Sequence, residues 1–142
     1  IPSSVTYVGS SAFNDCSSLT SFTIPPSVTR INENTFGLCS SLEEINIPSS
    51  VDVIRKHAFN QCKSLKKIKI PHSVTEIGDE AFIKCSSLTQ ISVPSSVVKI
   101  RDNAFTEAIT ELIIPSSFKK SLDEIGINSN VKITRIHIYL LF

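Results

Sequence analysis

The chain has 142 residues, of which 41% are hydrophobic and 19% are charged, and this ordinary globular composition argues against intrinsic disorder. The formal net charge of +1 gives no global reason to expect nucleic acid, an anionic membrane or a strongly acidic partner, although charge can still be patchy. The chain begins at Ile1 and contains no Met, so we expect it to be a piece of a longer product that lacks the true N-terminus.

Prolines mark an internal repeat that covers most of the chain. Five of them lie 23 residues apart, at Pro2, Pro25, Pro48, Pro71 and Pro94. The repeat unit reads I-P-x-S-V-x-x-I-x-x-x-A-F-x-x-C-x-S-L-x-x-I-x, and its first four copies are complete. The fifth copy is two residues short, and a sixth start at Ile114 degenerates after Phe118. We therefore predict about five repeats and a partial sixth start at 1–118, followed by a C-terminal cap at 119–142.

A repeat of this length cannot bury an apolar face alone, so neighbouring copies must stack around a shared core. Four apolar columns are predicted to form that core. They are Val8, Ile31, Ile54, Ile77 and Ile100; Phe13, Phe36, Phe59, Phe82 and Phe105; Leu19, Leu42, Leu65, Leu88 and Ile109; and Phe22, Ile45, Ile68, Ile91 and Leu112.

Each copy contains three predicted local elements. The Ser-Val-x-x-Ile stretch after the Pro predicts a short extended segment, and the Ala-Phe stretch a turn or a single helical turn. The Leu-x-x-Ile-x-Ile stretch, such as 42–47, alternates with period two and ends at Pro, which suits a short strand. Stacked copies then give a mostly β solenoid of parallel short strands, right-handed by the crossover rule.

The repeat unit, with its Ala-Phe and Cys-x-Ser-Leu elements, resembles the BspA-like, treponemal class of leucine-rich repeats. The resemblance covers residues 1 to about 118 and implies a leucine-rich-repeat solenoid. Members of this class are known from bacterial surface proteins and from parasitic protists, where they are regarded as adhesins or protein-binding modules. The resemblance therefore implies interaction and not chemistry.

The four cysteines, Cys16, Cys39, Cys62 and Cys85, share one repeat position. A straight column at 23-residue spacing does not converge tetrahedrally as a zinc site requires, so we expect no metal. Parallel stacking sets these side chains side by side, which suits disulfide geometry poorly. We predict buried free thiols that act as small apolar residues.

Serine recurs in two columns, one after the Pro and one before the Leu, and we expect its hydroxyl to satisfy local backbone groups where the coil turns. His57, His72 and His137 occupy different repeat positions, and no phosphate-binding loop, nucleophile elbow or zinc-protease motif occurs in the sequence. We therefore predict no enzyme activity, no catalytic residue and no cofactor.

Function is expected at outward positions that vary between copies, because packing accounts for the repeated ones. We define the strand face as the two outward columns of the main strand: Ser21, Glu44, Lys67, Gln90 and Glu111, and Thr23, Asn46, Lys69, Ser92 and Ile113. Acidic Glu43 and Glu44 lie beside a basic trio in the next copy. Two interpretations stay open, a partner-binding surface and a solvated face of mutually compensated charges. No aromatic residues interleave with the lysines as single-stranded nucleic acid binding would favour.

The C-terminal segment 131–140 alternates apolar and polar residues with a phase break near Thr134 and Arg135, which predicts a bulged strand that caps the stack. The alternative is an apolar edge at Ile136–Phe142 that pairs with a second molecule. That apolar run is far shorter than a membrane span. We expect a monomer, with an end-to-end dimer through the solenoid ends as the alternative.

These observations predict a protein–protein interaction module that presents an extended solenoid surface, with adhesion or recognition at a cell surface favoured by the resemblance. An intracellular protein-binding scaffold or regulatory subunit is the alternative, and an enzyme fragment is a remote one. The expected partner is protein, with no nucleic acid and no small-molecule substrate. The location is open, with the cell surface ahead of the cytoplasm.

Overall fold

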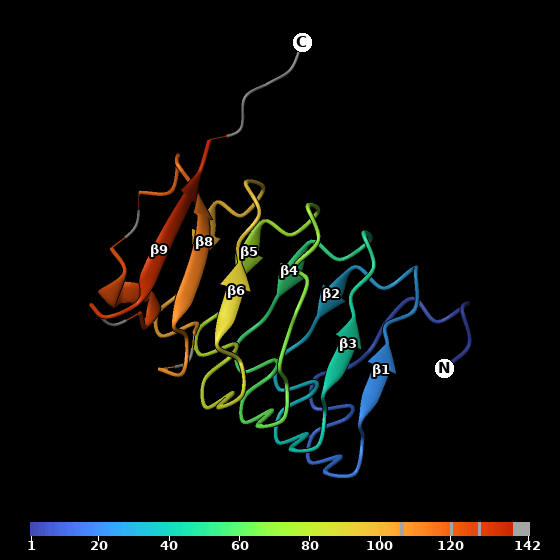
Figure 1. The fold of residues 1–142 in the computed structure, drawn as a ribbon. Coiled ribbons are helices and arrows are strands. Elements are labelled where there is room, and N and C mark those ends of the chain that lie inside the picture. The colour runs from blue at the N-terminus through green and yellow to red at the C-terminus, as the bar shows by residue number, and fades with distance from the viewer. Residues whose placement is uncertain (106, 120, 128, 138–142) are drawn as a thin grey trace.

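The computed structural model describes residues 1–105, 107–119, 121–127 and 129–137, and these wind into a stack of similar coils (Figure 1). The strands are β1 (Ser21–Thr23), β2 (Arg30–Ile31), β3 (Glu44–Asn46), β4 (Val53–Ile54), β5 (Glu76–Ile77), β6 (Gln90–Ser92), β7 (Lys99–Ile100), β8 (Glu111–Pro115) and β9 (Lys132–Ile136). A 3-10 turn, η1 (Asp123–Ile125), lies between β8 and β9. The predicted solenoid of short parallel strands is confirmed. In the part of the chain with assigned structure, no helix has the length and apolar character needed to cross a membrane.

Strands on two sides of the stack form parallel sheets. On one side, β2, β4, β5 and β7 pair so that Ile31, Ile54, Ile77 and Ile100 lie in register. On the other side, β1 pairs with β3, and β6 pairs with β8 and then β9. Partners such as Phe22 and Ile45 share one repeat position, so the 23-residue period of the sequence is also the register of the sheets. Figure 1 shows β1, β3, β6, β8 and β9 along one face.

The third coil, residues 48–70, interrupts the second of these sheets. Its expected strand around Lys67–Lys69 is not formed, and no backbone hydrogen bond within the described structure joins 66–70 to either neighbouring coil. The side chains still alternate, because Lys67 and Lys69 are exposed while Ile68 and Ile70 are buried. The expected continuous sheet is therefore wrong at this coil: its residues face the right way but do not share the strand ladder.

The core follows the predicted columns. Phe36, Phe59, Phe82 and Phe105 are all buried, and their rings stack face to face, with the centroids of Phe59 and Phe82 5.3 Å apart and their planes at 3°. In the first coil Phe13, Leu19 and Phe22 are half-buried, because that coil has a neighbour on one side only. The burial of each column thus depends on the adjacent coil.

The Ala-Phe corner is a turn. Ala58, Ala81 and Ala104 are fully buried, and their carbonyls accept hydrogen bonds of 2.8 to 2.9 Å from the Phe amides of the preceding coil. Left-handed backbone flanks the corner at two repeat positions, which are Ser11, Asn34, His57, Glu80 and Asn103, and Asp15, Leu38, Gln61 and Lys84, with φ between 50° and 62°. These strained residues recur in every complete coil, so the corner geometry is set by stacking and not by a glycine.

β9 adds one more strand at the end of the stack. β9 pairs with β8 over five consecutive residues, from Glu111 opposite Lys132 to Pro115 opposite Ile136. The strand is confirmed, but the bulge expected near Thr134 and Arg135 does not occur there. Arg135 instead stays exposed at the open edge, and its guanidinium donates a 3.1 Å hydrogen bond to the Phe118 carbonyl. The part of the expected apolar edge beyond 137 lies outside the described residues.

Gly78 offers a direct test of the close stacking. A Cβ added to it would lie 2.5 Å from the Lys56 amide nitrogen, whereas one added to Gly9, at the same repeat position, would meet only the Tyr7 ring at 3.8 Å. We expect Gly78→Ala to lower the free energy of unfolding by about 2 kcal/mol through overpacking. Gly9→Ala should change it far less. Urea unfolding of both variants checks this, and equal midpoints would contradict the stacking geometry.

Candidate functional site

The strand face lies where the sequence predicts it. β1, β3, the 66–70 segment, β6 and β8 carry its ten residues, and eight of them are exposed. Glu111 and Ile113 are half-buried because β9 pairs alongside β8, and Lys132 lies 2.9 Å from the Glu111 carboxylate. The cap therefore covers the last coil of the face and leaves coils 1 to 4 open.

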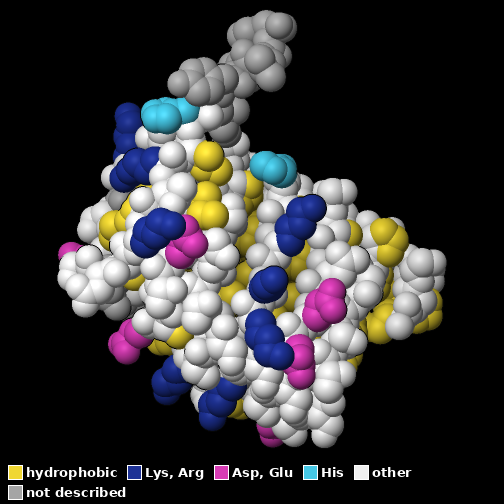
Figure 2. Space-filling view, viewed as in Figure 1, with side chains coloured by type: hydrophobic (Ala, Val, Ile, Leu, Met, Phe, Trp, Pro, Cys, Tyr) yellow, Lys and Arg dark blue, Asp and Glu magenta, His cyan; other side chains and the backbone are white. Residues whose placement is uncertain are grey.

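Charge on this face is only partly compensated. Lys66 Nζ donates to Glu43 Oε2 at 3.0 Å, and Glu111 is held by Gln90 at 3.0 Å as well as by Lys132. Figure 2 shows Lys and Arg side chains over the middle of the face with acidic side chains beside them.

Three charged residues of the face stand apart from these pairs. Glu44, Lys67 and Lys69 are exposed, and among the residues with described structure none of them forms an ion pair. Glu44 and Lys67 occupy the same repeat position in adjacent coils and do not pair, whereas Lys66 and Glu43 of the same two coils do. The second and third coils thus hold one compensated pair, Lys66 with Glu43, beside charge of both signs that has no ion pair in the described structure.

The cysteines form the expected column of free thiols, with Cys39, Cys62 and Cys85 buried and Cys16 half-buried. Each buried thiol donates to a Phe carbonyl of the preceding coil at 3.1 Å, as Cys62 does to Phe36. Burial raises the pKa of Cys39 to about 11 and that of Cys85 to about 12, and it holds the pKa of Cys62 well above its ordinary value. Across the described ranges, no group of three His, Cys, Asp or Glu side chains is arranged to hold a metal ion.

The serines after the Pro correct a prediction. Ser50 Oγ donates to the Val28 carbonyl at 2.7 Å and Ser73 Oγ to the Val51 carbonyl at 2.6 Å, so both join neighbouring coils rather than close a local turn. Ser96 Oγ is buried and has no hydrogen-bond partner in the described structure. The sequence predicted local hydrogen bonds for these serines because a single copy of the repeat cannot reveal a bond that spans 22 residues.

The histidines do not converge. His57 Nε2 lies 2.6 Å from Glu80 Oε2, at equivalent positions of adjacent coils. His72 and His137 are exposed and belong to other parts of the fold. The His57–Glu80 pair is therefore another link between coils.

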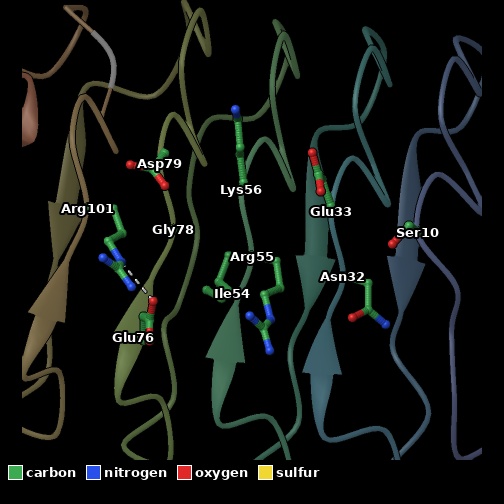
Figure 3. Close-up of a pocket in the computed structure, with 10 residues that line it drawn as sticks. All are labelled: Ser10, Asn32, Glu33, Ile54, Arg55, Lys56, Glu76, Gly78, Asp79 and Arg101. Atoms are coloured by element: carbon green, nitrogen blue, oxygen red, sulfur yellow. Dashed lines mark hydrogen bonds and ion pairs between the residues drawn. The ribbon is translucent and has the colours of Figure 1, made fainter.

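A polar groove on the opposite sheet escaped sequence reasoning. Its volume is about 470 Å³, and its lining includes Arg55, Lys56, Glu76, Gly78 and Arg101 (Figure 3). Arg101 Nε donates to Glu76 Oε1 at 3.0 Å, whereas Arg55 and Lys56 are exposed and form no ion pair in the described structure. The column Gly9, Asn32, Arg55, Gly78 and Arg101 carries the signal that was missed, since Gly78 removes a side chain between two arginines.

Comparisons with known proteins bear on the fold. Residues 1–110 match the model of the BspA type leucine rich repeat region, with six copies. The comparison with curated proteins gave no significant match.

Solved structures agree with the match to the family model. The chain is similar to the leucine rich repeat protein TpLRR of T. pallidum, with 31% identity, a TM-score of 0.81, and coverage of 92% of this chain and 63% of that one. It is also similar to a leucine-rich repeat protein of Bacteroides ovatus, with 27% identity, a TM-score of 0.70, and coverage of 95% and 46%. Pneumococcal vaccine antigen PcpA shares the fold at 21% identity and a TM-score of 0.80, over 94% of this chain and 35% of that one. The chain thus spans less than two thirds of each of these three structures.

The thiol column predicts a graded reactivity. Because the thiolate is the reactive form, burial and the raised pKa of Cys39, Cys62 and Cys85 should protect these three thiols from a disulfide reagent at pH 8. We expect about one equivalent, Cys16, to react with the native protein and four after denaturation. A Cys16→Ser variant should remove the fast phase. Fast reaction of more than one thiol in the native protein would contradict the packing of this column.

Proposed function

Because the chain belongs to the BspA-type leucine-rich repeat family, we propose that it is a protein–protein interaction module whose strand face determines which partner it binds. Family membership supports protein binding as the function, and the variable strand face supports the proposed location of the binding surface. The repeated positions are occupied by core packing and links between coils, so they leave little freedom for specificity. The outward positions differ from coil to coil, as a recognition surface requires.

One observation supports the strand face as the binding surface. Glu44, Lys67 and Lys69 are exposed charges of both signs without an ion pair in the described structure, and Glu44 and Lys67 occupy the same outward repeat position in adjacent coils. Opposite charges arranged in a fixed pattern favour a complementary partner and repel others.

Adhesion or recognition at a cell surface is the setting that we propose for this interaction. The family resemblance supports it, and an intracellular scaffold or regulatory subunit is the alternative. Protease treatment of intact cells that make the full gene product separates the two, since only a surface protein is digested. We assign the chain no catalytic role, cofactor, nucleic acid or small-molecule substrate, which fits histidines that are dispersed over the described coils.

Site-specific photo-crosslinking tests the proposed surface. A crosslinking amino acid in place of Asn46, exposed on β3, should capture a partner protein, whereas one in place of Val98, exposed beside β7 on the other sheet, should not. In host or own-species lysates, we expect the adduct yield at Asn46 to exceed that at Val98 by about tenfold or more.

The matching loss-of-function variant combines Glu44→Ala, Lys67→Ala and Lys69→Ala. It should abolish the Asn46 adduct while the melting temperature stays unchanged, since these side chains are exposed. Capture from the Val98 position alone, or an adduct that survives the triple variant, would move the binding surface elsewhere.

A further inference from the structure

Positive charge is concentrated in the third coil. Residues 48–70 contain six basic side chains against one acid, Asp52, and so carry a net charge of +5. The basic residues are Arg55, Lys56, Lys63, Lys66, Lys67 and Lys69. The whole chain carries only +1, so the remaining coils and the cap together are acidic, at −4. The third coil is therefore a basic band between acidic neighbours.

Lys67 and Lys69 are the available charges of this band on the strand face. Lys66 is neutralised by Glu43 at 3.0 Å, whereas Lys67 and Lys69 are exposed and have no ion pair in the described structure. They lie on the same side of the chain and are two residues apart, which places their Cα atoms roughly 6.6 Å from one another along an extended segment. That spacing matches two side chains at alternate positions of another extended peptide.

A hollow at the end of the band adds an apolar element. It has a volume of about 360 Å³ and is lined by residues of coils 3, 4 and 5 and of the C-terminal part of the chain, among them Lys69, Ile70, Val93, Pro94 and Ile136. Because Lys69 borders it, a peptide whose carboxylate faces Lys69 would place the next side chain on the same face, two residues along, at this hollow. Lys69 and the hollow therefore favour a peptide in which an apolar side chain follows a carboxylate on the same face.

We propose that the strand face binds an acidic, extended segment of a partner protein that lies along the third coil, with carboxylates on alternate residues paired to Lys67 and Lys69. An apolar side chain of the same segment enters the hollow beside Lys69, and a basic group of the partner faces Glu44. This inference rests on the proposed function and specifies its partner.

The acidic neighbours distinguish a peptide from a continuous polyanion. Adjacent coils are about 4.8 Å apart, so a nucleic acid, an anionic polysaccharide or a membrane that covers Lys67 also meets the exposed Glu44 of the preceding coil. Like-charge contact of this kind is unfavourable. A single strand laid along the coil can place its carboxylates over the lysines and a basic group toward Glu44, which a continuous polyanion cannot do.

A synthetic peptide tests the inference directly. The probe is fluorescein-labelled Leu-Thr-Glu-Thr-Glu-Thr-Leu, and the control peptide has Gln in place of both Glu residues. We expect saturable binding of the probe in 10 mM salt, loss of binding with the control peptide, and weakening at higher salt as screening increases. The double variant Lys67→Glu/Lys69→Glu should lower the affinity for the probe by about tenfold or more.

Two matched variants separate this site from general charge. Arg55→Glu/Lys56→Glu makes the same change in net charge in the same coil but on the groove side, and should leave the affinity within about twofold. Glu44→Lys should raise the affinity for the probe, because it removes a negative charge that repels the acidic peptide. The probe carries no basic group that Glu44 could attract. Melting temperatures confirm that each variant is folded.

Three results would overturn the inference: no binding of the probe to the wild type, equal weakening by both double variants, or stronger competition by a heparin oligosaccharide or single-stranded DNA than by unlabelled probe. None of them would affect the Asn46 crosslinking result. The acidic partner segment and the strand face as a binding surface can therefore fail independently.

Discussion

The structure depends on one constraint, which is that no coil can bury its own apolar column. Each Phe ring is covered by the ring of the next coil, as Phe59 and Phe82 are at 5.3 Å, and each Phe amide is bonded to the carbonyl before the next ring. The small residue at that position, such as Ala81, leaves room for this contact. Stability is therefore a sum of contacts between neighbours, and the same residue types must return every 23 positions to maintain it.

This constraint divides the molecule into an invariant interior and a surface that is free to vary. Thiols, hydroxyls and the His57–Glu80 pair all connect coils, so chemically versatile side chains serve the stack. The strand face is different at the third coil, where Lys67 and Lys69 lie on backbone that does not join the ladder. Packing explains nothing about these two side chains, and for that reason they are the best candidates for recognition.

Sequence reasoning recovered what one repeat copy encodes and missed what arises between copies. The core columns and the strand face follow from period and alternation, which single copies contain. The broken ladder at 66–70 does not, because Lys67–Lys69 follows the same pattern as Glu44–Asn46 and differs only in its relation to neighbouring coils. The bonds of Ser50 and Ser73 to the preceding coil were missed for the same reason. The close approach of Gly78 to Lys56 was also missed, because its only signal in the sequence is one Gly at a repeat position where neighbouring copies have Arg.

Native-state hydrogen exchange tests the central claim, that stacking holds every coil while the strand face is released from the ladder at the third one. The amides of Phe36, Phe59 and Phe82 should exchange only on global unfolding, because each is bonded to the next coil. The amides of Lys67 and Lys69 should exchange at least about a hundredfold faster, which corresponds to roughly 2.7 kcal/mol less protection. Protection of Lys67 and Lys69 equal to that of Phe59 would show a continuous ladder and would contradict the account.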